Sequence, residues 1–194
     1  MMMKDYMRIR EIAKIDEEIR KCRRCKLHKT RTNAVPGEGP ADARIMICGQ
    51  APGRTEDEEG RPFVGMAGKF LNEMLESIEL DRGKIFVTSP IKCFPPDNRL
   101  PKSDELKACR PYLEEQIRII KPKVIIALGN CGLQILLERK LTTSKLHGQP
   151  QEKNGIIILP TFHPSAAMRF PKIRALVEED FKRFKDLLVK IGLV

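Results

Sequence analysis

Four of the six cysteines in this 194-residue chain have a spacing that favours a soft-metal site. Cys22 and Cys25 form a C-x2-C pair, and Cys93 and Cys109 lie farther along the chain with fifteen residues between them. Four thiolates hold zinc or an iron–sulfur cluster, and spacing alone does not choose between the two. The basic residues around the first pair should lower its thiol pKa values. The alternative is an isolated C-x2-C in a basic loop.

A second group of candidate residues follows four short β-rich runs, at residues 44–48, 85–89, 123–128 and 156–160. Each run leads into a Gly, Pro or polar cluster. The carboxyl ends of parallel strands form the ligand crevice of an open α/β sheet. Tight turns explain the glycines and prolines, but they do not explain one of only three histidines, His163, together with Asn98. We therefore expect a site at this edge that contains Gly49, Gln50, Ala51, Phe63, Ser89, Asn98 and His163.

Helical patterns alternate with these runs. Apolar spacing predicts helices near residues 5–20, 70–78, 106–120, 133–137 and 172–190, the third behind an N-cap at Ser103 and interrupted at Pro111. In the first helix, Ile9, Ile12, Ile15 and Ile19 form the apolar stripe. This order predicts the α/β class, specifically a three-layer α/β/α arrangement with a central four-stranded parallel sheet. We expect a single domain over residues 1–194.

Composition narrows the functional class. The chain is 41% hydrophobic and 32% charged, with a formal net charge of +10. This charge favours a polyanionic partner, most simply nucleic acid. No apolar run is long enough to span a bilayer, so we expect a cytoplasmic protein without a membrane partner. An aromatic content of 5% favours a base-flipping enzyme over a protein that stacks on single strands.

Several segments, taken in order, resemble the family 4 uracil-DNA glycosylases, the iron–sulfur type found in archaea and thermophilic bacteria. The match runs from Cys22 to the last predicted helix. It comprises the four cysteines, Pro36-Gly37-Glu38-Gly39-Pro40, the loop at residues 49–53, Glu56-Asp57, Gly60-Arg61-Pro62-Phe63-Val64-Gly65, Lys92-Cys93, Pro95-Pro96-Asp97-Asn98-Arg99 and His163-Pro164. Each segment alone is modest evidence, and together they are specific.

The resemblance implies a structural 4Fe-4S cluster on Cys22, Cys25, Cys93 and Cys109, and hydrolysis of the uracil–deoxyribose bond in single- or double-stranded DNA by a monomer. We expect Phe63 to stack on the flipped base, and His163 and the loop amides to stabilise the uracil anion. Asn98, Glu56 or the phosphates of the substrate itself would activate water. Met168 would enter the vacated stack, and Arg169, Lys172 and Arg174 would hold phosphates.

Two residues depart from the family pattern. Gln50 stands where the family usually has Glu, and Ser89 stands where it usually has Asn. An Asn amide both donates to uracil O4 and accepts from N3–H, whereas a Ser hydroxyl has one proton. Two alternatives follow: a glycosylase with a shifted base preference, such as hypoxanthine, or a DNA-binding iron–sulfur protein with weakened activity. The presence of Phe63, Asn98 and His163 favours the active enzyme.

Overall fold

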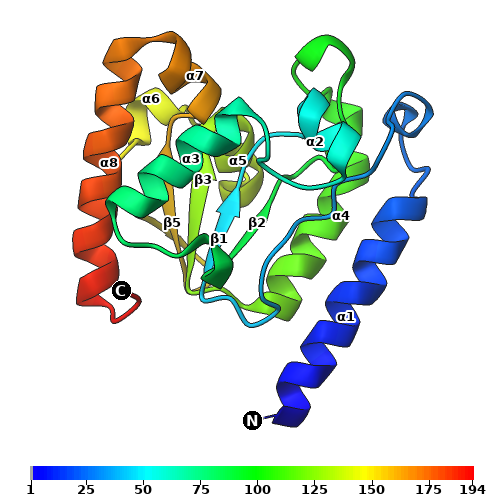
Figure 1. Cartoon of the computed structure of the whole chain (residues 1–194), viewed down its shortest axis with the longest axis horizontal. Coiled ribbons are helices and arrows are strands. Elements are labelled where there is room, and N and C mark those ends of the chain that lie inside the picture. Colours follow the sequence, from blue (N-terminus) through cyan, green and yellow to red (C-terminus); the bar gives the residue numbers. More distant parts are fainter. Residues whose placement is uncertain (1) are drawn as a thin grey trace.

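The protein is built around a five-stranded sheet, seen in a computed structural model that describes residues 2–194, with side chains from residue 5 onward (Figure 1). The strand order is β2-β1-β3-β5-β4. The four parallel strands are β1 (Ile45–Cys48), β2 (Ile85–Thr88), β3 (Val124–Leu128) and β5 (Ile156–Thr161). The predicted parallel sheet is therefore confirmed, with one addition at its edge.

The additional strand is β4 (Gln151–Lys153), which pairs antiparallel with β5. Its three residues are polar and lie at an edge where one face remains open to solvent. A strand this short and polar carries neither an apolar run nor a clear alternation, so the sequence pattern did not reveal it.

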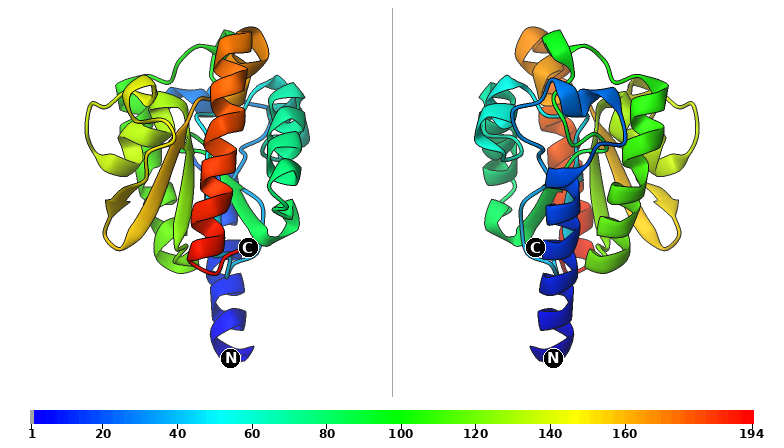
Figure 2. Two further views of the ribbon diagram at one scale, coloured as in Figure 1. Left: turned by 90° about the vertical axis from the view of Figure 1, so that its left-hand side faces the viewer. Right: turned by 90° about the vertical axis from the view of Figure 1, so that its right-hand side faces the viewer.

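Helices cover both faces of the sheet, which confirms the predicted α/β class (Figures 1 and 2). One face packs against α3 (Met66–Ser77) and α8 (Pro171–Lys190). The other packs against α1 (Met2–Lys21), α4 (Ser103–Ile120) and α5 (Gly129–Leu137). β1 and β3 are buried along their whole lengths, as expected for central strands covered on both faces. The short helices are α2 (Arg54–Glu59), α6 (Thr143–Leu146) and α7 (Pro164–Arg169), with 3-10 turns η1 (Lys26–Lys29), η2 (Arg82–Lys84) and η3 (Pro96–Asn98).

Three details of the predicted helices were wrong. In α1, Ile12, Ile15 and Ile19 are buried, but Ile9 is 58% exposed because the first turns of α1 extend beyond the body of the protein (Figure 2). Ser103 is the first residue of α4 rather than its cap, and the Lys102 N–H at the cap donates to the Glu105 carboxylate. α4 also continues through Pro111 without a restart.

The loops that follow the four parallel strands lie at one edge of the sheet. Because β1, β2, β3 and β5 are parallel neighbours, their carboxyl ends open on the same edge of the sheet. Among residues 2–194, no helix is long and apolar enough to cross a membrane.

Candidate active site and cysteine pocket

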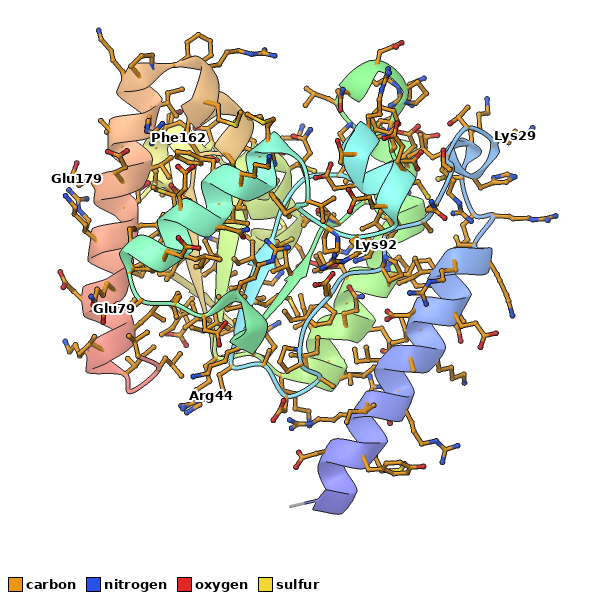
Figure 3. All side chains as sticks on the ribbon, viewed as in Figure 1. Lys29, Arg44, Glu79, Lys92, Phe162 and Glu179 are labelled. Carbon is orange, nitrogen blue, oxygen red and sulfur yellow. The ribbon has the colours of Figure 1, made fainter. Side chains whose placement is uncertain are left out.

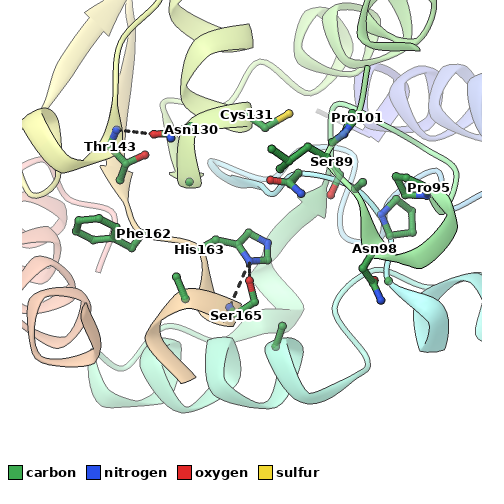
Figure 4. Close-up of a pocket in the computed structure, with 18 of the residues that line it drawn as sticks. Ser89, Pro95, Asn98, Pro101, Asn130, Cys131, Thr143, Phe162, His163 and Ser165 are labelled. Carbon is green, nitrogen blue, oxygen red and sulfur yellow. Dashed lines mark hydrogen bonds between the residues drawn. The ribbon is translucent and has the colours of Figure 1, made fainter. Parts of the chain in front are cut away.

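A cleft of about 1300 Å³ lies at the carboxyl ends of the four parallel strands. Figure 4 shows His163 beyond β5 with its ring in this cleft, Ser89 beyond β2, and Asn98 on the opposite side. The predicted residues that line it are Gln50, Ala51, Glu56, Phe63, Ser89, Asn98, His163, Met168 and Arg169. Loops far apart in the sequence therefore meet where the strand-end argument expects them.

Phe63 forms one wall of the cleft and is held there by two glycines. A Cβ on Gly49 would lie 2.7 Å from Cζ of Phe63, and a Cβ on Gly68 would lie 1.8 Å from the Phe63 carbonyl oxygen, so neither position has room for a side chain. Phe63 itself has a φ of 52°, a left-handed conformation that is costly for an aromatic residue. Its ring centroid is 6.0 Å from that of His163. The strained backbone thus presents a fixed aromatic face beside the imidazole.

Gly49 was predicted to bind the substrate, but it lies behind the residues that line the cleft. Its N–H donates to the Thr88 carbonyl oxygen at 2.9 Å, and the residue is buried. Gly49 therefore supports the cleft by leaving room for the Phe63 ring and the Ser89 hydroxyl, rather than by offering its amide to a ligand. The amide was predicted to be free because sequence does not reveal where the β1–β2 hydrogen bonds end.

Glu56 ties two loops of the cleft together. Oε2 accepts a hydrogen bond from the Gly53 N–H at 3.0 Å, and Oε1 accepts from the N–H groups of Val64 and Gly65 at 3.0 and 2.8 Å. Three backbone donors thus converge on this one carboxylate. Its geometry suits a clamp between the loop after β1 and the loop that carries Phe63.

His163 presents one ring nitrogen to the cleft. The Ser165 N–H donates to Nδ1 at 3.3 Å, and the Ser165 hydroxyl lies 2.8 Å from the same nitrogen (Figure 4). Since Nδ1 accepts, the neutral ring carries its proton on Nε2. Burial lowers the pKa of His163 to about 4, against a smaller opposing effect of Glu56. The imidazole is therefore a neutral hydrogen-bond donor at physiological pH.

Asn98 projects from a stiff loop on the other side of the cleft. Asp97 and Asn98 both have left-handed φ values, 59° and 53°. The next residue, Arg99, forms a bidentate pair with the buried Glu105, at 2.9 and 2.6 Å. Within residues 2–194, the Asn98 carboxamide has no hydrogen-bond partner and is exposed to the cleft. The role of Glu105 was missed, although its position three residues after the helix cap was a readable signal.

The predicted DNA-contacting residues divide into two groups. Met168 and Arg169 line the cleft at the end of α7. Lys172 and Arg174 do not; they are exposed on the first turn of α8. Arg174 lies over the Phe70 ring at 5.1 Å and donates to Glu178 at 2.9 Å, so its guanidinium is already engaged between α8 and α3.

The four predicted cysteine ligands line one small pocket, away from the cleft. Cys22 follows α1, Cys25 is the N-cap of η1, Cys93 lies in the loop after β2, and Cys109 lies in α4. All four are free thiols. Within the described residues, no three Cys, His, Asp or Glu side chains are grouped as ligands of one metal ion.

The surroundings of Cys25, Cys93 and Cys109 raise their thiol pKa values, whereas the sequence predicted a lower pKa for Cys25. Burial raises the pKa of Cys25 and Cys93 and raises that of Cys109 to about 12. This effect outweighs the nearby cations, including Arg31, whose Nη1 lies 3.1 Å from the Cys93 sulfur. A buried thiol of this kind gives up its proton only when a metal replaces it.

A buried polar network lies between the cysteine pocket and the cleft. Lys92 (Figure 3) is 1% exposed, and its Nζ donates to Thr88, Gln116 and the Pro36 carbonyl at 2.5, 2.7 and 3.1 Å. Burial lowers the pKa of Lys92 to about 8. The network fixes the start of the β2 loop, which carries both Ser89 and Cys93.

Comparison with known proteins identifies the class to which this fold and cleft belong. Residues 36–188 match the model of the uracil DNA glycosylase superfamily, and the chain belongs to that superfamily. A type-4 uracil-DNA glycosylase of Sulfurisphaera tokodaii is 46% identical over 92% of this chain and 85% of the relative. Those of Saccharolobus solfataricus and Thermotoga maritima are 45% and 40% identical, over 90% and 96% of this chain and 85% and 100% of the relatives. The resemblance drawn from the motifs is thereby confirmed.

Proposed function

We propose that the protein excises uracil from DNA by hydrolysing its N-glycosidic bond, leaving an abasic site for base excision repair. The observation that carries the chemical part of this proposal is the fixed tautomer of His163. Its Nδ1 is occupied by Ser165, so Nε2–H donates into the cleft. The family membership supports the substrate class.

Base recognition is assigned to two residues that line the cleft, Phe63 and Ser89. A flipped uracil stacks on Phe63, whose orientation is locked by Gly49 and Gly68. Its polar edge faces Ser89, which is 7% exposed and lines the cleft. Flipping is required because the glycosidic bond cannot be reached inside a duplex. The short Ser89 hydroxyl reads the base directly or through one water.

Bond cleavage leaves negative charge on uracil and positive character on the sugar. We assign stabilisation of the uracil anion to the Nε2–H of His163, with further donation from the loop at Gln50 and Ala51. A preorganised donor of this kind typically contributes about 3–4 kcal/mol to transition-state stabilisation. Because the ring is neutral, it can lie beside Glu56 without forming an ion pair that would compete for the proton.

The attacking water is assigned to Asn98. Backbone N–H groups already occupy three of the roughly four lone-pair sites of the Glu56 carboxylate. The Asn98 carboxamide has no partner among the described residues, and it can accept from a water and orient it towards the sugar. Glu56 then acts through the loops that it holds, as a positioning residue.

The cofactor assigned to the cysteine pocket is a 4Fe-4S cluster on Cys22, Cys25, Cys93 and Cys109. Soft thiolate donors suit iron–sulfur chemistry, and all four cysteines line one pocket. These cysteines would hold the cluster between α1, α4 and the β2 loop. The Arg31 guanidinium would donate to the Cys93 thiolate.

A lesion panel tests the function. Purified protein is incubated with duplexes that carry uracil, hypoxanthine, a T·G mismatch or no lesion, and with single-stranded uracil DNA. Free base is identified by mass. We expect uracil release from both strand forms and no release from undamaged DNA. Faster release of hypoxanthine than of uracil would favour the shifted base preference, and DNA binding without release of any base would favour the weakened enzyme.

A further inference from the structure

Large apolar side chains are exposed on both rims of the cleft. On one rim Leu100 is 72% exposed, and on the other Met168 and Phe170 are 43% and 53% exposed. All three line the cleft. Clusters of exposed apolar side chains around a cavity mark a surface that is covered when a partner binds. The sequence already predicts that Met168 enters the vacated stack, whereas Leu100 has no assigned role.

Leu100 is held in its exposed position by its neighbours. The Arg99 guanidinium donates to the Leu100 carbonyl at 3.1 Å while it pairs with Glu105. The proline at position 101 fixes the following backbone angle. Because Arg99 anchors the carbonyl to the start of α4, the Leu100 backbone cannot turn inward without breaking these bonds. A backbone segment that is already held in place loses little conformational entropy when a partner covers it.

The charges around Leu100 favour a polyanion as that partner. Arg99 and Lys102 flank it on its own rim, and Arg169 lies across the cleft. Two exposed carboxylates, Asp97 and Asp104, lie on the same rim, but the whole chain carries a net charge of +10. The Arg99 charge is paired with Glu105, so Lys102 on this rim and Arg169 across the cleft are the cations available to phosphates beside an opened base stack.

We propose that Leu100 is a second apolar wedge that packs against the opened base stack of duplex DNA, on the side of the lesion opposite Met168. This role rests on the proposed function, since it presupposes a flipped base. Flipping from a duplex breaks stacking and pairing, and apolar side chains that enter base steps compensate for the loss. A single strand has no paired stack to hold open. The contribution of Leu100 is therefore specific to duplex DNA.

The test compares strand forms in one sequence. Single-turnover uracil release is measured on single-stranded DNA, on a U·A duplex and on a U·G duplex, for wild type, Leu100→Ala and Leu100→Met. The control is Ile9→Ala, which truncates another exposed apolar side chain, on α1 and away from the cleft. Thermal unfolding is recorded for each variant. Duplex with 2-aminopurine beside the lesion reports unstacking through its fluorescence.

We expect Leu100→Ala to lower the ratio of U·A duplex rate to single-strand rate roughly tenfold, because truncation removes most of the apolar area available to the stack. The U·G duplex, which opens more easily, should be affected less. The 2-aminopurine signal should fall as well, and Leu100→Met should retain both. Ile9→Ala should match wild type.

An unchanged ratio, or equal losses on single-stranded and duplex DNA, would overturn the role of Leu100. The failure of the proposed function looks different, since wild type would then release no uracil from any strand form. The 2-aminopurine measurement on a duplex with an abasic site tests the wedge without requiring cleavage. A signal from Leu100→Ala equal to that of wild type would contradict the proposal there too.

Discussion

The substitution Glu56→Gln distinguishes two possible roles of Glu56, a clamp that holds two loops together and a general base that activates water. Glutamine has the size of glutamate, but one of its two terminal groups is a donor. Whichever way its amide turns, an NH2 group faces either the Gly53 N–H or the N–H groups of Val64 and Gly65. At least one hydrogen bond to a charged group is lost, at about 1.5–3 kcal/mol, and those that remain become weaker. We expect the free energy of unfolding to fall by about 2–4 kcal/mol.

For a chain of this length, each kcal/mol shifts the melting temperature by about 2–4 °C, so the midpoint should fall by about 5–15 °C. Single-turnover uracil release should fall less than about tenfold at a temperature where the variant is folded, with an unchanged pH profile. Loss of a general base would instead cost about 10²–10⁴-fold and remove one limb of that profile. Glu59→Gln, at an exposed carboxylate of the same helix, is the control. A rate loss above a hundredfold at an unchanged melting temperature would refute the clamp.

Three further predictions concern the cofactor, the imidazole and the base reader. The isolated protein should be brown with about four irons per chain, and Cys93→Ala should bleach and destabilise it; stoichiometric zinc in a colourless protein would reject the cluster. His163 should show no NMR titration step near pH 6.5, because its pKa is about 4 in the folded state. Between pH 6.5 and pH 4 the folded state therefore binds fewer protons at His163 than the unfolded state does. The contribution of His163 makes the free energy of unfolding fall as pH falls through this range, and His163→Gln should remove that contribution. Ser89→Asn should keep or raise uracil release and sharpen rejection of cytosine by about 1–3 kcal/mol, while a Ser89→Ala variant identical to wild type on both bases would show that Ser89 does not read the base.

Much of the fold could be predicted because its signals are local. Apolar runs of four to six residues that alternate with helical spacing indicate buried parallel strands, and β1, β2, β3 and β5 lie within a residue or two of their predicted bounds. The edge strand β4 has no apolar run, and its signal lies in the Asn154-Gly155 pair that joins it to β5, a tight hairpin turn that was missed.

The site could be predicted only as a set of loops that meet at one edge. Parallel strands place Ser89 and His163 together whatever the details of the loops. The partners of Glu56 could not be predicted, because they are backbone N–H groups of residues that any sequence could supply. The same holds for the thiol pKa values: charge near Cys25 is visible in the sequence, but burial, which decides the direction, depends on tertiary packing.

The most direct test of the proposed active site is single-turnover uracil release by His163→Ala, with DNA affinity measured in parallel. The neutral Nε2–H makes its strongest hydrogen bond as charge develops on uracil, so its loss should slow cleavage by roughly a hundredfold or more while DNA binding changes little. Near-normal cleavage by the variant would contradict this account and remove His163 from the mechanism.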